Sequence, residues 1–380
     1  MSKPIEAEVI VVGAGIAGAS LAYFLACRGR GAGVVILERE EQPAVHSTGR
    51  SAAMAVELHH DPIVRSLIHR GVGFLESPPA DFAEAPVYDP VGVLAPAEGA
   101  AWTDLRRFGE VLAAEGITVA EVSPDDVIRR VPVLERARME GALCLPGNGH
   151  IDVHGLLSGY LARARRAGAE LRCNVEVKSL AVERGRCVGV ETNKGPLRAR
   201  WVAIAAGAWS GALSATAAGA APIDLQPRRR TAISFAAPTG VDPRRWPVVD
   251  CDWRGVYFKH ESGGFLASPM DQEPSVPCDA APTEEAVADA IEKLRLIAPA
   301  IVPGALRRKW AGLRTFAPDE RPVVGPDPRL PGLFWVAGQG GVGIETSPVL
   351  GDLAAAALIE GKTADDPLGR ALSPARFERP

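Results

Sequence analysis

Short runs of mostly apolar residues recur along the chain, and each run ends at a glycine or a charged residue. They cover residues 8–12, 33–37, 202–206 and 333–337. A run without polar alternation is typical of a parallel strand that is buried on both faces. Helical patterns follow the first run and recur over 346–360. The chain is therefore predicted to have an α/β fold with a Rossmann-like parallel sheet.

A second pattern occupies residues 219–309, where polar and apolar positions alternate. The alternation predicts a strand over 229–235 and a hairpin whose strands, 256–259 and 265–268, flank a Ser-Gly-Gly turn. Thr283 is a favourable N-cap for a helix with one apolar face. The apolar positions of that helix are Ala286, Val287, Ala290, Ile291, Leu294 and Ile297. We expect this face to pack in the core.

The first strand leads into a glycine motif with the spacing G-x-G-x-x-G. Gly13 permits the tight turn, Gly15 lets the backbone approach a pyrophosphate, and Gly18 lets the next helix pack against the strand. Glu38 ends the following strand, at the position where an acid accepts hydrogen bonds from a ribose. The sequence therefore predicts a bound adenine dinucleotide. The motif alone does not distinguish FAD from NAD.

Segments far from the motif favour FAD over NAD. No further strand–helix–strand unit follows Glu38 directly; instead, a small polar loop, 46–53, could lie against a planar ring. Residues 174–177 are predicted to form a short strand whose backbone meets an adenine. The glycine-rich loop 339–344 precedes a helix, and its N–H groups could stabilise negative charge on a reduced flavin. An extended FAD needs such contributions from distant segments.

These segments supply the residues that we predict to contact FAD. They are Gly13, Gly15, Ile16, Ala17, Gly18, Glu38, Arg39, His46, Ser47, Thr48, Gly49, Arg50, Ser51, Ala52, Ala53, Val175, Glu176, Val177, Ala206, Gly207, Trp209, Gly312, Gly338, Gln339, Gly340, Gly341, Val342, Gly343 and Ile344. No cysteine lies where we could assign a covalent link to the flavin. We therefore expect FAD to be bound non-covalently.

Several of these motifs occur together in one known family. The glycine motif, the loop 46–53, the segment Trp-Ala-Gly-Leu-Arg at 310–314 and residues 336–344 resemble flavoproteins of the D-amino-acid oxidase (DAO) superfamily. That superfamily includes glycine oxidase, sarcosine oxidase and D-amino-acid dehydrogenases. The likeness is greatest to the bacterial D-arginine dehydrogenase type and extends over nearly the whole chain, including residues 225–230 and 344–347.

The resemblance implies two interleaved domains. The first is a Rossmann-like, GR2-type FAD-binding domain made of residues 1–84, 147–218 and 310–380. The second is a smaller α+β substrate domain made of residues 85–146 and 219–309, whose antiparallel sheet roofs the flavin.

The predicted chemistry is hydride transfer from the substrate Cα to flavin N5, with the substrate carboxylate held still. The fork of an arginine matches two carboxylate oxygens, and Arg314 lies among apolar neighbours, where an unpaired charge is costly. By resemblance, Arg314 is the carboxylate clamp and Tyr257 donates a second hydrogen bond. Arg229 is a weaker candidate, and His59 lies on a segment that resembles a mobile lid. A structural explanation stays open for each residue. Arg314 could form an ion pair and Tyr257 could be an ordinary sheet residue. Arg229 could be a solvated arginine and His59 a surface histidine.

Departures from the arginine type argue against a basic substrate. Relatives carry a tyrosine near His59 and a histidine where this chain has Met54. They also place an acid within the segment that corresponds to 90–94, which is apolar here. We therefore predict a neutral or apolar D-amino acid, or a secondary amine such as an N-methyl or cyclic imino acid. Glu345 is expected to favour the N-terminus of the helix over 346–360 by its charge.

Three other functions stay open or are disfavoured. A 2-hydroxy-acid dehydrogenase could use the same carboxylate clamp, and a flavin-binding subunit without activity could serve a partner. A hydroxylase that uses NAD(P)H is disfavoured because the chain has no second convincing dinucleotide motif. The electron acceptor, a quinone or O2, cannot be inferred from these motifs.

Charge and cysteine usage limit the partners. The chain has 42 Lys and Arg against 46 Asp and Glu, a net charge of −4 without a dense basic run, which argues against nucleic acid. No metal site is predicted. The six cysteines are scattered and suggest reduced thiols in a cytoplasmic protein, peripheral at the inner membrane if it is a dehydrogenase. Residues 201–223 carry no charge but are rich in Ala and Gly, so we expect a strand and turn rather than a membrane span.

Overall fold

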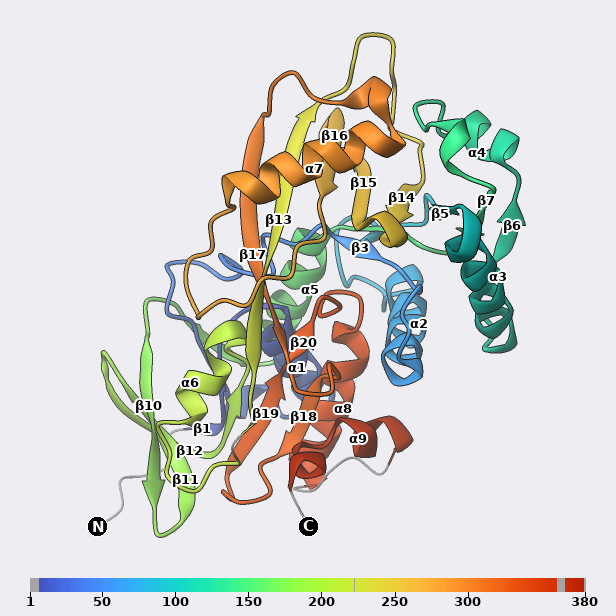
Figure 1. The fold of residues 1–380 in the computed structure, drawn as a ribbon. Helices are drawn as coiled ribbons and strands as arrows, with labels where there is room; N and C mark the ends of the chain where they lie inside the picture. The colour runs from blue at the N-terminus through green and yellow to red at the C-terminus, as the bar shows by residue number, and fades with distance from the viewer. Residues whose placement is uncertain (1–6, 222, 361–365, 379–380) are drawn as a thin grey trace.

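The computed structural model describes residues 7–221, 223–360 and 366–378, and two large β-sheets organise them. In the view of Figure 1, an eight-stranded sheet lies in the lower half and a nine-stranded sheet in the upper half. A three-stranded sheet is built from β3 (Met54–Ala55), β4 (Tyr88–Asp89) and β8 (Gly149–Ile151). The α/β fold predicted from the apolar runs is confirmed.

The eight-stranded sheet has a parallel centre that draws on both ends of the chain. Its strands are β1 (Ala7–Val12), β2 (Val34–Leu37), β9 (Glu170–Arg172), β10 (Val177–Glu183), β11 (Arg186–Thr192), β12 (Gly195–Ile204), β18 (Val323–Pro326) and β19 (Leu333–Ala337). β1 lies between β2 and β12, and β19 pairs in parallel with β12. β1, β2 and β19 are almost entirely buried, as expected for strands covered on both faces. All four apolar runs thus form neighbouring strands.

One predicted strand is wrong. Residues 174–176 are a turn before β10, and Asn174 adopts a left-handed conformation with φ 56°. The backbone N–H of Val175 donates to the carbonyl of Glu38 at 2.8 Å instead of to a neighbouring strand. The valines in this segment resemble a strand, but the left-handed turn directs the chain back toward the end of β2.

Helices α1 (Ile16–Cys27), α5 (Val153–Arg166) and α8 (Ser347–Glu360) pack against one another beside the parallel strands. α1 and α8 are apolar on nearly all sides, so both lie inside the core rather than on its surface. The helix predicted over 346–360 corresponds to α8. The remaining α-helices are α2 (Pro62–Glu76), α3 (Gly99–Ala114), α4 (Pro124–Arg130), α6 (Ser210–Ser214), α7 (Glu284–Ile297) and α9 (Pro367–Leu372). The 3-10 helices are η1 (Gly31–Gly33), η2 (Arg136–Arg138), η3 (Gly207–Trp209), η4 (Asp252–Arg254), η5 (Pro299–Ile301) and η6 (Pro374–Phe377).

The nine-stranded sheet is antiparallel except where β14 pairs in parallel with β5. In order across the sheet, its strands are β20 (Gln339–Gly340), β17 (Arg308–Phe316), β13 (Gln226–Ala236), β16 (Gly264–Ser268), β15 (Val256–Glu261), β14 (Val248–Cys251), β5 (Val93–Ala97), β7 (Gly141–Leu145) and β6 (Ala120–Val122). The predicted hairpin is β15 and β16, and the predicted strand over 229–235 lies within β13. The predicted clamp segment, 310–314, lies within β17.

One face of the nine-stranded sheet packs against α7, which lies across the strands in Figure 1. The Thr283 hydroxyl accepts a hydrogen bond from the N–H of Ala286 at 3.2 Å, so the predicted N-cap is confirmed. Val287, Ala290 and Leu294 pack against Ile233 and other apolar residues of this face. The opposite face of the sheet is thereby left to line a cavity.

The division into two interleaved domains stays a prediction, although the strand pairing bears on one boundary. β17 pairs with β13 over its whole length, so the proposed boundary at residue 310 falls inside a strand of the nine-stranded sheet. Within the uncharged segment 201–223, β12 ends at Ile204 and η3 and α6 follow. Every helix among the described residues is too short or too polar to span a bilayer.

Candidate active site

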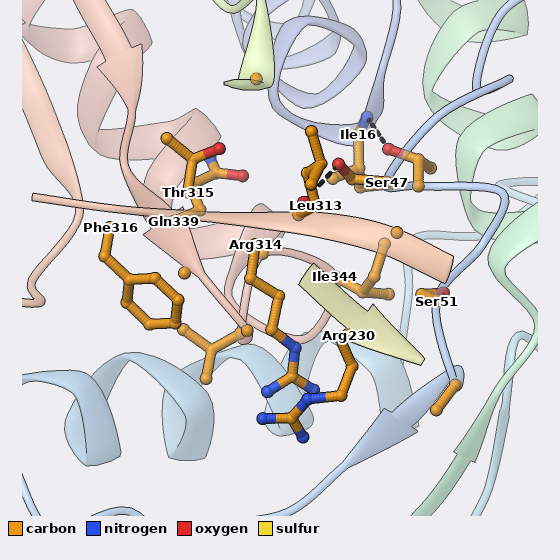
Figure 2. Close-up of a pocket in the computed structure, with 18 of the residues that line it drawn as sticks. Ile16, Ser47, Ser51, Arg230, Leu313, Arg314, Thr315, Phe316, Gln339 and Ile344 are labelled. Atoms are coloured by element: carbon orange, nitrogen blue, oxygen red, sulfur yellow. Dashed lines mark hydrogen bonds between the residues drawn. The ribbon is translucent and has the colours of Figure 1, made fainter. Parts of the chain in front are cut away.

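A large cavity of about 1110 Å³ lies between the two main sheets. It is lined by the loops at the carboxyl ends of β1, β2, β12 and β19, and by one face of β13, β14, β15 and β17. In open α/β sheets, ligands bind outside the carboxyl ends of the parallel strands. Figure 2 shows the part of this cavity in which β17 and the loop after β19 meet.

The glycine motif lies at one end of the cavity. A Cβ on Gly13, whose φ is +107°, would stand 2.5 Å from the carbonyl oxygen of Ala205, and one on Gly18 would stand 2.0 Å from that of Gly13. A Cβ on Gly15 would meet only the Thr48 hydroxyl, at 3.2 Å. Gly13 and Gly18 therefore allow close packing of the backbone, whereas Gly15 leaves room on the cavity side. α1 begins directly after Gly15, which has no side chain to cap the helix; the Thr48 hydroxyl accepts a hydrogen bond from the N–H of Ile16 at 3.1 Å. The N-terminus of a helix is a favourable place for a phosphate.

Glu38, which we predict to bind a ribose, also stabilises the backbone around it. Its carboxylate accepts hydrogen bonds from the N–H of Ala14 at 2.9 Å and from the N–H of Glu40 at 3.0 Å, and it lines the cavity. The Arg39 guanidinium lies 3.8 Å from the centre of the Trp209 ring. This end of the cavity thus combines an acid, two planar groups and exposed backbone, which suits a nucleotide.

Nearly all the residues predicted to contact the cofactor line the cavity; the exceptions are Gly18 and Gly49. Gly18 packs against the end of β1. Gly49 donates its N–H to the carbonyl of Ala44 at 2.9 Å, and a Cβ there would stand 2.2 Å from the same oxygen. Gly49 therefore shapes the loop 46–53 rather than contacting the cavity.

Hydrogen bonds join this loop to β17. The Ser47 hydroxyl donates to the carbonyl of Leu313 at 2.6 Å, as Figure 2 shows, and the Trp310 indole donates to the carbonyl of Arg50 at 3.1 Å. Beside these contacts, Thr315 Oγ1 and Gln339 Nε2 line the cavity, buried and without a hydrogen-bond partner among the described residues. Such orphaned polar atoms fit the polar ring edge of a flavin.

Two arginines from adjacent strands share one part of the cavity. Arg314 of β17 and Arg230 of β13 lie on the same face of the sheet, and Figure 2 shows their side chains side by side. Arg230 donates through Nε to the carbonyl of Asp271 at 2.8 Å. Within the part of the chain that the structure describes, the Arg314 guanidinium has no hydrogen-bond or ion-pair partner. Burial and the charge of Arg314 lower the pKa of Arg230 to about 10, so Arg230 stays charged at pH 7.

Arg229 does not line this cavity, so its predicted place in the substrate pocket is wrong. Neighbouring residues of a strand point to opposite faces, and Arg229 forms an ion pair with Glu273 on the face away from the cavity. The sequence held a signal for the correct choice. Ile233 and Phe235 are the apolar positions that face α7, and counting back in steps of two assigns Arg229 to their face and Arg230 to the other.

Gly341 makes room for the Arg314 side chain. A Cβ at this position would stand 2.6 Å from Arg314 Nη1 and 2.8 Å from Cζ. Replacing Gly341 with alanine is therefore expected to displace the guanidinium and to lower kcat/KM by about 10- to 100-fold, because small misplacements of positioning groups are costly. Steady-state kinetics, expressed per bound FAD, measures the effect.

Gly211→Ala is a matched control, because a Cβ there meets its nearest neighbour at an ordinary 3.6 Å. Equal kinetics for Gly341→Ala and Gly211→Ala would mean that the position of Arg314 does not matter.

Tyr257 and Asp250 lie opposite each other on β15 and β14, and both line the cavity. Tyr257 is buried, as a hydrogen-bond donor to an enclosed ligand would be. Asp250 was not anticipated from the sequence. Its Oδ1 is buried without a hydrogen-bond partner among the described residues. Burial, together with the charge of Asp252, raises the pKa of Asp250 to about 7, although Arg230 and Arg314 oppose this shift.

His59 lines the cavity just before α2. Its Nδ1 accepts a hydrogen bond from the N–H of Asp61 at 3.2 Å, and burial lowers its pKa below the ordinary value, so the ring is neutral at pH 7. Arg65 donates to the carbonyl oxygens of His59 and His60 and pairs with Glu115 at the end of α3. These contacts anchor the segment, and its role as a lid stays a prediction.

Glu345 does not act as a charge at the start of α8, contrary to our expectation. Its side chain is buried against the cavity, and burial raises its pKa to about 8, so the carboxyl is protonated at pH 7. Burial carries the larger weight, because the nearby charge of Arg314 acts in the opposite direction.

Replacing Glu345 with glutamine is expected to stabilise the protein in alkaline solution. A carboxyl whose pKa is raised in the folded state makes the fold lose stability as pH rises from about 4.5 to about 8. Removing the proton-binding group removes this loss, so Tm should rise by about 3 °C at pH 8.5 and change little at pH 5. Calorimetry of the holoprotein measures both values. A similar gain from the exposed Glu110→Gln control would contradict the assignment to Glu345.

The far end of the cavity combines apolar and acidic groups. Met54, Leu58 and Phe108 line it, and Ala95–Ala97 of β5 line it in place of the expected segment 90–94. Acidic residues that the sequence reasoning did not consider, Asp104, Asp252 and Glu320, also line the cavity. None of the six cysteines lines the cavity. Among the described residues, no group of three or more acids, histidines and cysteines could hold a metal.

Comparison with known proteins gives a consistent result. The family model described as DAO, FAD dependent oxidoreductase, matches residues 8–357. The chain is 26% identical over 372 residues to 4-methylaminobutanoate oxidase (formaldehyde-forming) of Paenarthrobacter nicotinovorans, covering 94% of this chain and 44% of that protein. It is 25% identical over 359 residues to mitochondrial dimethylglycine dehydrogenase of Homo sapiens, covering 89% and 41%. The chain thus spans less than half the length of these two relatives.

Solved structures resemble the chain over nearly its whole length. The structure of L-proline dehydrogenase from P. horikoshii superimposes with a TM-score of 0.88 at 25% identity and covers 99% of both chains. That of iminodiacetate oxidase from Chelativorans sp. BNC1 superimposes with a TM-score of 0.79 at 27% identity and covers 96% of this chain and 98% of that one.

Proposed function

The chain belongs to the DAO family of FAD-dependent oxidoreductases, and from this premise we propose that it oxidises the carbon–nitrogen bond of a small amino or imino acid. FAD is the cofactor of this family, and the cavity has the donor set and the shape to receive it. The glycine motif, Glu38, the loop 46–53 and the loop 339–344 would hold it.

The arginine pair is the observation that carries this proposal. Two charged guanidinium groups share one part of the cavity, and Arg314 has no partner among the described residues. Arg230 is buried and Arg314 is half-buried. A cation that is shielded from water without a partner is costly, so such a site is stabilised by a bound anion. A carboxylate meets the fork of an arginine with two parallel hydrogen bonds. A small carboxylic acid beside the cofactor loops is therefore the ligand that these residues suit best.

In the mechanism, the residues of the nine-stranded sheet orient the substrate. Arg314 binds the carboxylate, and the Tyr257 hydroxyl is placed to donate a second hydrogen bond. Hydrogen bonds from two residues to the carboxylate restrict rotation of the substrate, which supplies several kcal/mol toward the reacting geometry. Met54, Met270 and Ala232 line the same region and reduce access of water. FAD, when bound, supplies the acceptor for the hydride that leaves the substrate carbon.

The names of the relatives favour a substituted amine over a primary one. 4-Methylaminobutanoate, dimethylglycine, iminodiacetate and L-proline all contain a carboxylate and a nitrogen that bears more than one carbon. Of the substrates predicted from the sequence, we therefore propose an N-methyl or cyclic imino acid first and a neutral or apolar D-amino acid second. The D-configuration stays a prediction, and the choice between a quinone and O2 as electron acceptor stays open.

Steady-state turnover with an artificial electron acceptor tests this proposal. The panel contains sarcosine, N-methylalanine, both enantiomers of proline, neutral amino acids of both configurations, D-arginine and 2-hydroxy acids. We expect the highest kcat/KM for an N-methyl or cyclic imino acid, with the corresponding aldehyde or imine as product. Turnover confined to 2-hydroxy acids would identify a hydroxy-acid dehydrogenase instead. Faster turnover of D-arginine would contradict the neutral substrate.

A further inference from the structure

Asp250 has no task in the mechanism above, although it lies in the same part of the cavity. It stands on β14, directly opposite Tyr257 on β15. The charges of Arg230 and Arg314 both act on its carboxyl. The clamp and this carboxyl therefore face one enclosed space.

The carboxyl of Asp250 is not neutralised by the arginines beside it. Within the described residues it forms no ion pair, and its Oδ1 is buried without a hydrogen bond. A buried carboxylate oxygen without a donor is costly. One ligand that carries both a negative and a positive charge can satisfy the two arginines with the first charge and the Asp250 carboxyl with the second.

We infer that Asp250 binds the protonated α-nitrogen of the substrate while Arg314 binds its carboxylate. This inference rests on the proposed function. The ammonium N–H donates to Asp250 Oδ1, which fixes the second end of the zwitterion. Asp250 then accepts that proton: the N–H bond breaks, an O–H bond forms on the carboxylate, and the electron pair stays on nitrogen as the lone pair of a neutral amine. The proton returns to water when the product leaves.

The surroundings of Asp250 suit a group that exchanges a proton near neutrality. The charged groups that act on it are Asp252 of η4, Arg230 of β13 and Arg314 of β17, and the titratable Tyr257 of β15 lies opposite it. The neighbouring strand β5 has the sequence Val-Leu-Ala-Pro-Ala and adds no charge. Burial and Asp252 hold the pKa of Asp250 near 7, so the carboxylate and the acid are both accessible at physiological pH.

Pairs of ligands that differ only at the nitrogen test this inference. Sarcosine and proline carry the amine, whereas methoxyacetate and tetrahydrofuran-2-carboxylate replace it with an ether oxygen. The dissociation constants of the ethers are measured from the change in the oxidised flavin spectrum, and those of sarcosine and proline from the dependence of the anaerobic flavin reduction rate on their concentration. Asp250→Asn should weaken binding of sarcosine or proline by at least about tenfold and change binding of the ethers less than about twofold.

Two further measurements distinguish recognition of the amine by Asp250 from a general effect of the substitution on the fold. Asp89→Asn is the matched control, because Asp89 also lies on a strand, β4, but is exposed and does not line the cavity. It should leave both classes of ligand nearly unchanged. The rate of flavin reduction should rise with pH through an acidic limb in the wild type, and Asp250→Asn should move that limb toward the pKa of the free ammonium.

The outcomes are distinguishable. Equal weakening of amines and ethers, or no weakening of either, overturns the role of Asp250 even if the enzyme turns over. Weakening confined to amino acids with a second amino group in the side chain would assign Asp250 to the side chain and overturn the inference. If no amine reduces the wild-type flavin and no carboxylate perturbs its spectrum, the proposed function itself fails, and this inference falls with it.

Discussion

Replacement of Arg314 with methionine is expected to lower kcat/KM by about a thousandfold while the protein keeps its FAD. The methionine preserves the length of the side chain but removes both hydrogen bonds to the carboxylate. Removing one partner of a buried, hydrogen-bonded charge pair costs about 2–5 kcal/mol, and each 1.4 kcal/mol is about tenfold. Rapid mixing under anaerobic conditions measures the rate of flavin reduction for the best substrate of the panel.

Two variants frame this result. Arg314→Lys keeps the charge but loses the fork, so its kcat/KM should lie between those of the wild type and Arg314→Met. Arg229→Met removes an arginine whose side chain pairs with Glu273 outside the cavity, and its kcat/KM should stay within about threefold of the wild type. A loss of less than about fivefold in Arg314→Met would exclude Arg314 as the carboxylate clamp.

Replacement of Gly15 with alanine is expected to weaken FAD binding by at least about tenfold without unfolding the chain. The new methyl group causes little steric conflict within the protein, because only the Thr48 hydroxyl lies near it, at 3.2 Å. The φ of Gly15, −72°, is also accessible to alanine. The methyl group would instead occupy the space through which the pyrophosphate approaches the backbone.

The measurement is a titration of FAD into apoprotein, followed by flavin fluorescence, with circular dichroism as a check on the fold. Gly73→Ala is the matched control, since a Cβ on Gly73 in α2 meets nothing within 4 Å. Unchanged FAD affinity in Gly15→Ala would show that the pyrophosphate does not lie against this turn.

Much of the fold could be predicted because its signals are local. The apolar runs ending at Gly13, Glu38, Gly207 and Gly338 identified strands that turn out to be neighbours in one sheet. Spacing within a single turn sufficed to assign Gly13, Gly15 and Gly18, since their tasks depend on the backbone around them. The N-cap at Thr283 could be predicted because it too depends only on neighbouring residues.

The features that sequence reasoning missed depend on the three-dimensional arrangement. Arg230 is a cavity residue because β13 turns that face away from α7, and only the alternation with Ile233 and Phe235 distinguishes it among three consecutive arginines. Asp250 is 64 residues from Arg314 along the chain, and only the strand order β17-β13-β16-β15-β14 brings it to the same cavity. Asn174 adopts a left-handed conformation, whereas the valines near it in the sequence favour a strand.

Our central claim is that an amino or imino acid, bound by Arg314 in the cavity, reduces the bound FAD. Anaerobic mixing of the purified holoprotein with the substrate panel tests it most directly, because loss of the oxidised flavin absorbance requires no assumption about the electron acceptor. We expect an N-methyl or cyclic imino acid to bleach this absorbance in the wild type and to do so about a thousandfold more slowly in Arg314→Met. Full retention of the absorbance with every amine-containing acid, in protein that carries FAD, would contradict the claim.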